Sequence, residues 1–364
     1  MGKLYVFGGR QRELGLKEMT YEEEWSRYES ALIAEVDPET REIRICVEYQ
    51  SPREARAGDK PSANFHSGAI VGDTLYTCTT TEVLIYHLPA FRLTGYISLP
   101  CFNDVHHVTP TTDGNLLVVS TGLDMVVKVS RKGEVLEEWS ALADEALWTR
   151  FSRTIDYRQV ATTKPHRAHP NYVFELGGEL WVTRFYQRDA ISLNDSHNKI
   201  ELGGEMPHDG IVHGDRIYFT AVDGKIAVVN RETLKVEHMV DLREIQDKGY
   251  LVLPAWCRGL LLVNERTMWV GFTRMRRTKF RENLRWVKAY IPDTRLAKPT
   301  HIALFDIVEK KCLKEIELES YGVDTIFSIF PVPEQKRDNE SIDPGKQIAI
   351  ISNDAQSNEH NLQS

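Results

Sequence analysis

Four histidines in this sequence share one local pattern, in which a small or polar residue stands two positions later and an apolar strand follows. A neutral imidazole is the commonest metal ligand in proteins, and it suits Fe, Mn, Zn, Ni or Cu. A fifth copy of the pattern has cysteine in place of histidine, and a sixth has phenylalanine. The six positions are His66-x-Gly68, His107-x-Thr109, His169-x-Asn171, His208-x-Gly210, Cys257-x-Gly259 and Phe327-x-Ile329.

Each position opens a strand–turn–strand unit, such as HSGAIVGDTLYTCT from residue 66 and HDGIVHGDRIYFTA from residue 208. The turns are rich in Gly, Asp and Asn, which is typical of β-hairpins. Third and fourth strands follow most units, for example KIAVVN and KVEHMVDL. Four antiparallel strands that recur every ~40–60 residues indicate a β-propeller.

The repeat predicts an all-β protein with six blades, and seven blades is the alternative. We expect a single propeller domain over residues 1–352, closed by N-terminal strands pairing with TIFSIFPV and QIAIISND, and a polar tail over 353–364. KLYVFGG and QIAIISND both fit the role of one second strand.

Three insertions interrupt the repeat. Residues 10–30 are acidic, residues 141–168 begin with the helical pattern ALADEALWTRF, and residues 274–298 are basic with a partly helical pattern. The basic segment 274–288 is interpreted either as a lid that attracts an anionic substrate or as a surface for a protein partner.

The first strand of every propeller blade lines the central channel, so equivalent positions lie at one height around the axis. The pattern therefore predicts one divalent metal ion bound by four histidines. The predicted metal ligands are His66, His107, His169 and His208.

Other polar residues fall close to these positions. Candidate catalytic or substrate-binding residues are His208, Cys257, Arg258, Asn171 and Arg184. Asp104 and Asp209 could orient an imidazole through its second ring nitrogen. His106 and His166 are secondary candidates. His106 should face away from His107 unless a β-bulge exchanges them. His166 lies in the loop before His169 and could fold over the mouth of the channel. His213 and His301 are interpreted as structural.

The composition excludes some classes of partner. The 364 residues carry a net charge of −8, which argues against nucleic-acid binding. No run of about 18 apolar residues could span a bilayer, so no membrane partner is predicted. Five scattered cysteines without a CxxC pair favour a reduced, cytoplasmic protein. The oligomeric state is left open.

The segment HHVTPTTDGNLLVVSTGLDMVVKVSRKGEVLEEWSA resembles a blade of the arylsulfotransferase-type propellers, and HPNYVFELGGELWVTR resembles their His-x-Asn strand. The resemblance implies six blades and sulfate transfer through a histidine intermediate. His208 would be the nucleophile, with His107, His169, Asn171 and Arg184 as partners. The four-histidine set is also similar to the ligand set of carotenoid-cleaving oxygenases, which are seven-bladed propellers with Fe(II).

These observations favour an enzyme that acts on a small anionic metabolite with a bound metal ion, by lyase, hydrolase or oxygenase-type chemistry. One alternative is a metal-free sulfo- or other group transferase that uses a channel histidine. The other alternative is a non-catalytic binding scaffold.

Overall fold

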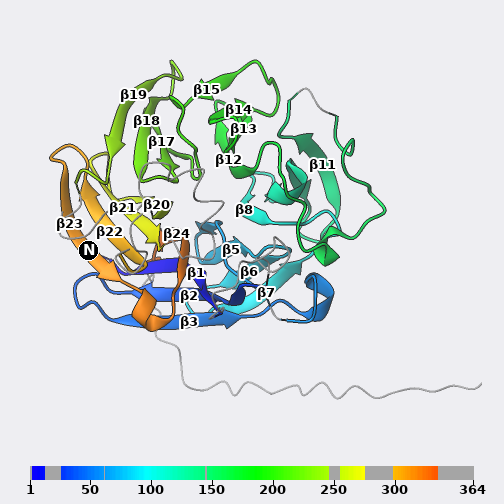
Figure 1. The fold of residues 1–364 in the computed structure, drawn as a ribbon, viewed down its shortest axis with the longest axis horizontal. Helices are drawn as coiled ribbons and strands as arrows, with labels where there is room; N and C mark the ends of the chain where they lie inside the picture. Colours follow the sequence, from blue (N-terminus) through cyan, green and yellow to red (C-terminus); the bar gives the residue numbers. More distant parts are fainter. Residues whose placement is uncertain are drawn as a thin grey trace, which may run out of the picture. The chain divides into compact units, whose positions relative to one another are not determined.

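The computed structural model describes residues 2–12, 26–60, 62–143, 146–245, 255–274 and 298–334. These residues form six four-stranded antiparallel sheets that follow one another around a central axis (Figure 1), so the predicted six-bladed β-propeller is confirmed. Residues Met1–Pro333 make up one compact unit, and residues Glu334–Ser364 form a second, of which only Glu334 is described.

The first three blades run from the inner strand outward in sequence order. Blade 1 contains β4 (Ala69–Val71), β5 (Thr74–Cys78), β6 (Val83–His87) and β7 (Arg92–Ile97). Blade 2 contains β8 (Val105–Pro110), β9 (Leu116–Ser120), β10 (Met125–Val129) and β11 (Val135–Ser140). Blade 3 contains β12 (Pro170–Leu176), β13 (Glu179–Arg184), β14 (Asp189–Ser192) and β15 (Lys199–Glu201).

Blades 4 and 5 continue this order, and blade 6 closes the circle. Blade 4 contains β16 (Ile211–His213), β17 (Arg216–Ala221), β18 (Lys225–Asn230) and β19 (Val236–Asp241). Blade 5 contains β20 (Trp256–Leu262), β21 (Thr267–Thr273), β22 (His301–Asp306) and β23 (Lys311–Glu317). Blade 6 contains β24 (Thr325–Pro331), β1 (Leu4–Gln11), β2 (Tyr28–Val36) and β3 (Ile43–Tyr49). The described 3₁₀ turns are η1 (Arg53–Ala55), η2 (Thr121–Leu123), η3 (Tyr157–Gln159) and η6 (Glu319–Tyr321).

The core consists of hydrophobic clusters, each lying between two neighbouring blades. On β9, Leu116 and Val118 pack toward blade 1, whereas Leu117 and Val119 pack toward blade 3. Side chains alternate between the two faces of a strand, so a blade buried on both faces needs apolar residues at successive positions. This explains why the second strands are continuous apolar runs such as LLVVS.

Blade 6 joins the two ends of the propeller, because β24 pairs with β1 in antiparallel register. The strand expected at TIFSIFPV is thus the inner strand of this blade, and KLYVFGG supplies its second strand. The backbones approach closely here, since a Cβ atom on Gly8 would lie 1.7 Å from the Thr325 carbonyl oxygen. The second candidate strand, QIAIISND, and the domain boundary at 352 lie outside the described residues.

A buried carboxylate connects blade 6 to blade 1. Glu82 is fully buried and accepts hydrogen bonds from four hydroxyl groups of both blades. The donors are Tyr49 (2.6 Å), Ser51 (2.5 Å), Thr79 (2.6 Å) and Tyr96 (3.0 Å). Both carboxylate oxygens are therefore satisfied by hydrogen bonds.

The predicted helix at residues 141–151 is wrong for the described residues, which form turns. Ala143 and Trp148 have φ values of 52° and 67°, which an α-helix cannot contain. The Trp148 indole instead donates to Glu138 at 3.1 Å. Most of the acidic and basic insertions lies outside the described residues. In the part of the chain that is described, no helix has the length and apolar character needed to cross a bilayer.

Candidate functional site

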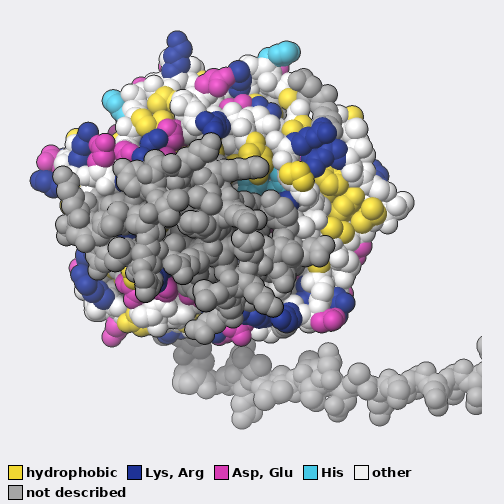
Figure 2. Space-filling view, in the orientation of Figure 1, with side chains coloured by type: hydrophobic (Ala, Val, Ile, Leu, Met, Phe, Trp, Pro, Cys, Tyr) yellow, Lys and Arg dark blue, Asp and Glu magenta, His cyan; other side chains and the backbone are white. Residues whose placement is uncertain are grey.

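Five histidine side chains gather where the inner strands of blades 1 to 4 begin. The ring of His106 stacks on that of His66 at 4.7 Å between centroids, and it lies 5.2 Å from His169 and 5.9 Å from His208. We call this group the histidine cluster, and its members are His66, His106, His166, His169 and His208. Figure 2 shows histidine side chains at the surface near the centre of this face, beside hydrophobic side chains.

His106 belongs to the cluster, whereas His107 does not. The register of β8 shifts between Val105 and His107, which is a β-bulge. A bulge places an extra residue in one strand and redirects the side chains beside it. The His107 ring stacks on Tyr172 at 3.8 Å, and its Nδ1 accepts a hydrogen bond from the Val173 backbone at 3.2 Å. The structure therefore has His106 where the spacing predicted His107.

In blade 5 the residue near the cluster is again one position away from the residue that the spacing predicts. Cys257 is packed in the hydrophobic cluster between blades 4 and 5, where burial raises the pKa of its thiol well above the usual value. Its neighbour Arg258 instead lies over the ring of Phe327, with 4.3 Å between the guanidinium carbon and the ring centroid. Phe327 in turn lies 4.4 Å from the His66 ring.

Backbone hydrogen bonds support this revised alignment. The amides of Phe65, Val105 and Cys257 each donate to a carbonyl of the preceding blade, namely Gly8, Thr80 and Val222. The residues that follow these amides are therefore equivalent, and they are His66, His106 and Arg258.

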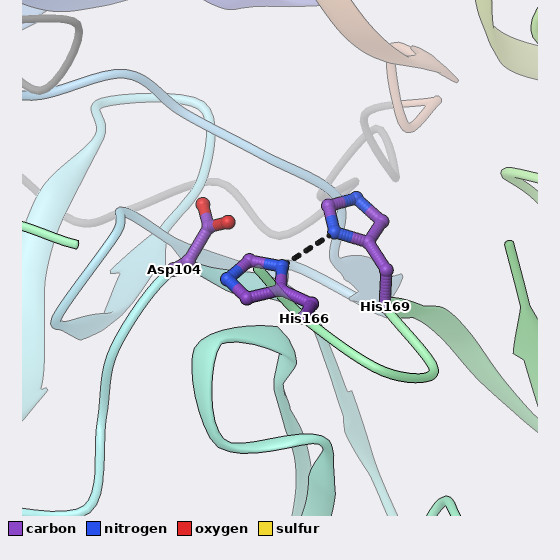
Figure 3. Close-up of side chains that lie close together, drawn as sticks. All are labelled: Asp104, His166 and His169. Atoms are coloured by element: carbon purple, nitrogen blue, oxygen red, sulfur yellow. Dashed lines mark hydrogen bonds between the residues drawn. The ribbon is translucent and has the colours of Figure 1, made fainter. Parts of the chain in front are cut away.

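Asp104, His166 and His169 form the tightest group of potential metal ligands among the described residues. Their donor atoms lie within 4.8 Å of one another, and the His166 and His169 Nδ1 atoms are 2.7 Å apart. Figure 3 shows the His166 ring between the Asp104 carboxylate and the His169 ring. Asp104 and His169 have φ values of 50° and 52°, a region that non-glycine residues seldom occupy outside turns and functional sites.

The loop that carries His166 and His169 is wrapped around one carboxylate. Asp124 accepts backbone hydrogen bonds from Arg167, Ala168 and His169 at 2.8–2.9 Å. The Arg150 guanidinium donates to the same carboxylate at 2.7 Å. Sequence reasoning missed Asp124, because nothing in the segment STGLDM distinguishes it from an ordinary turn aspartate.

His208 is held in one orientation by its neighbour in the chain. Its Nδ1 lies 3.2 Å from the Asp209 carboxylate, which also accepts from Thr220 at 2.6 Å and from the Gly259 amide at 2.9 Å. The His208 Nε2 is buried and has no hydrogen-bond partner among the described residues.

Two further predicted site residues are bound to the protein itself. The Arg184 guanidinium donates to both Asp189 oxygens, at 2.8 Å and 2.6 Å, and to the Ala141 carbonyl. Asn171 is fully buried, and its amide donates to the Pro207 carbonyl at 3.0 Å, which links blades 3 and 4. The described contacts of these two residues are therefore structural.

The cluster histidines are neutral at physiological pH. Burial lowers the pKa of all five, and it takes His66 to about 3. The neighbouring imidazoles lower the pKa values of His106 and His169 further, because a second positive charge would be repelled. Neutral imidazoles can bind a metal ion or accept a proton.

Burial also lowers the pKa of His107, to about 3, against the opposing effect of Asp209. An unfolded imidazole binds its proton near pH 6.5, so acid favours the unfolded chain below that pH. His107 should therefore lower the free energy of unfolding by ~2 kcal/mol at about pH 5 relative to about pH 7. In metal-free protein, His107→Gln should reduce the loss measured by urea unfolding between these pH values by that amount. The control variant His197→Gln changes an exposed histidine and should lose as much stability between these pH values as the wild type. An equal pH dependence in all three proteins would contradict the prediction.

Known structures resemble the chain in fold. A protein of unknown function from Bacteroides caccae is 16% identical, with a TM-score of 0.56, over 92% of this chain and 100% of that one. A nidogen/laminin complex gives 8% identity and a TM-score of 0.52 with the same coverage. Virginiamycin B lyase from Staphylococcus aureus gives 12% identity and a TM-score of 0.39, over 66% of this chain and 70% of that one.

The likeness is one of fold. No protein-family model and no curated protein sequence matches the chain. The comparisons show no relationship to arylsulfotransferases or to carotenoid-cleaving oxygenases.

Proposed function

We propose that this propeller is a metal-dependent enzyme in which Asp104, His166 and His169 bind one divalent transition-metal ion. The observation that carries the proposal is the convergence of their donor atoms within 4.8 Å. Ligands of one ion at bonds of about 2.1 Å lie at most about 4.2 Å apart, so the widest pair has to close by about 0.6 Å on binding.

The donor set fits a catalytic ion better than a structural one. Two imidazoles and one carboxylate leave coordination positions open, as in the His₂–carboxylate sites of zinc hydrolases and non-haem iron enzymes. An ion with this donor set supplies Lewis-acid chemistry, either by polarising a substrate oxygen or by activating water.

The surrounding residues support the same proposal. The His106 Nδ1 donates to the Asp104 carbonyl at 2.8 Å and fixes the backbone that carries this carboxylate. Asp124 fixes the His169 backbone in the same way. These hydrogen bonds fix the backbone of Asp104 and of His169, and a fixed backbone helps to preorganise the ligands that a metal site needs.

Metal analysis of the purified protein tests the proposal. After metal-replete expression we expect about one equivalent of a transition metal, and less than about 0.2 equivalents would contradict the proposal. Activity found in a substrate screen should disappear with a chelator and return when the metal is added back.

A second candidate is metal-free group transfer with His208 as the nucleophile. The orientation of its ring by Asp209 and the unpartnered Nε2 favour it, because an activated nucleophile needs one nitrogen held and the other free. This candidate predicts activity that survives chelation and a covalent adduct on His208 that mass spectrometry detects. The chelation experiment therefore separates the two functions.

A further inference from the structure

Arg258 places a positive charge beside the histidine cluster. Its guanidinium carbon lies 4.8 Å from the centroid of the Trp256 ring and 4.3 Å from that of Phe327. Phe327 also lies beside two histidines, with His66 at 4.4 Å and His208 at 6.0 Å between ring centroids. Phe327 is thus a shared neighbour of the guanidinium and the cluster, and the Arg258 charge contributes to the lowered pKa of His66 and His208.

This charge has no anionic partner among the described residues. The Arg258 Nε is buried and makes no hydrogen bond there, and no ion pair involves this side chain. Two other arginines of low exposure are paired, since Arg184 contacts Asp189 at 2.6 Å and Arg150 contacts Asp124 at 2.7 Å. Burial lowers the pKa of Arg258, against the effects of more distant acidic groups.

An uncompensated guanidinium in such a place is costly for the fold. Aromatic faces attract a cation, but they cannot accept the directional hydrogen bonds of its planar donor fork. Removing one partner from a buried ion pair is strongly destabilising, so a partly buried charge without an anionic partner lowers the stability of the free protein. A ligand that supplies the missing anion would remove this cost.

We propose that Arg258 binds the anionic group of the substrate, a carboxylate or a phosphate, while another part of the same molecule reaches the proposed metal site. Only the second part of this inference, contact of the substrate with the metal site, rests on the proposed function. Planar, bidentate recognition of such groups is what a guanidinium provides and a lysine does not. The substrate class is therefore small molecules with at least one carboxylate or phosphate group.

Anion binding can be measured without metal. We would titrate metal-free wild type, Arg258→Gln and Arg258→Lys with inorganic phosphate and, separately, with acetate, using calorimetry. The wild type should bind one of the two anions, which identifies the source of the charge. Both variants should bind it at least about tenfold more weakly, because a charge-assisted bidentate contact is lost.

A second measurement keeps the inference falsifiable if the variants bind too weakly to compare. In anion-free buffer, Arg258→Gln should melt at the wild-type temperature or a few degrees above it, because a partly buried charge without an anionic partner has been removed. The matched control Arg184→Gln should melt several degrees lower, because it leaves Asp189 unpaired. Melting of Arg258→Gln well below wild type would overturn the inference, as would equal anion affinities or no binding of either anion by wild type.

Metal content measured on the same samples separates this inference from the proposed function. A wild type that binds anion through Arg258 but holds no metal would overturn only the metal site. A protein that holds metal but shows no dependence on Arg258 would overturn only the anion site.

Discussion

Replacing His169 by alanine should abolish metal binding, with a fall in affinity of ~100-fold or more. The change removes one of three proposed ligands and leaves His166 without the ring that lies 2.7 Å from its Nδ1. Two remaining ligands hold an ion much less tightly, and any metal-dependent activity should fall with occupancy. The measurement is metal content by mass spectrometry, together with calorimetric titration by Zn²⁺ and Mn²⁺.

His107→Ala is the matched control for this prediction. His107 is a buried histidine that the residue spacing predicts as a ligand, yet its ring stacks on Tyr172 outside the cluster. The control should therefore retain wild-type metal content, provided that circular dichroism shows both variants folded. Equal metal loss in the two variants would favour the four-histidine site predicted from the sequence, and full retention in His169→Ala would refute the proposed ligand set.

Glu82→Ala should produce the largest loss of stability, ~3–5 kcal/mol. The change leaves four hydroxyl groups without their acceptor between blade 6 and blade 1. Blade 6 and blade 1 would then be held mainly by their shared apolar cluster, which includes Phe7 and Leu75. Urea unfolding at neutral pH measures the effect.

Two variants bracket the Glu82 prediction. Glu82→Gln keeps one oxygen acceptor and should lose less stability than Glu82→Ala. Glu175→Ala changes an exposed glutamate on β12 and should stay within about 0.5 kcal/mol of wild type. If Glu82→Ala were as stable as Glu175→Ala, the buried carboxylate would have no role in holding blade 6 against blade 1.

The fold could be predicted from the sequence because its signals are local and repeated. Apolar runs such as LLVVS, separated by turns rich in Gly, Asp and Asn, define strands wherever they occur. Six copies of the inner-strand pattern then fix the number of blades. The closure of the propeller could be predicted by counting strands. TIFSIFPV needs a second strand beside it, and the two candidates are KLYVFGG at the N-terminus and QIAIISND.

The site could be predicted only in part, because it depends on irregular backbone. The bulge in β8 decides that His106 and not His107 joins the cluster, and residue spacing does not encode it. In β20 the register shifts between Arg258 and Leu260, so residue spacing along this strand does not show which of Cys257 and Arg258 is equivalent to the cluster histidines. His166 and Asp104 lie in loops, and they approach His169 because Asp124 folds the segment before blade 3 around its carboxylate.

The helical expectation for residues 141–151 failed for a related reason. The pattern ALADEALWTRF has good helix formers, but propensity is a weak signal that tertiary contacts override. Trp148 donates to Glu138, and Arg150 donates to Asp124, so the segment is held across blade 2 by its side chains.

The closure of blade 6 also sets an order of events during synthesis. β24, the inner strand of blade 6, is the last described strand to leave the ribosome, although its partner β1 is the first. This strand carries Phe327, which contacts both Arg258 and His66. A nascent chain can therefore fold its early blades in sequence, yet it cannot enclose a ligand at the histidine cluster until the N-terminal strands receive their last partner.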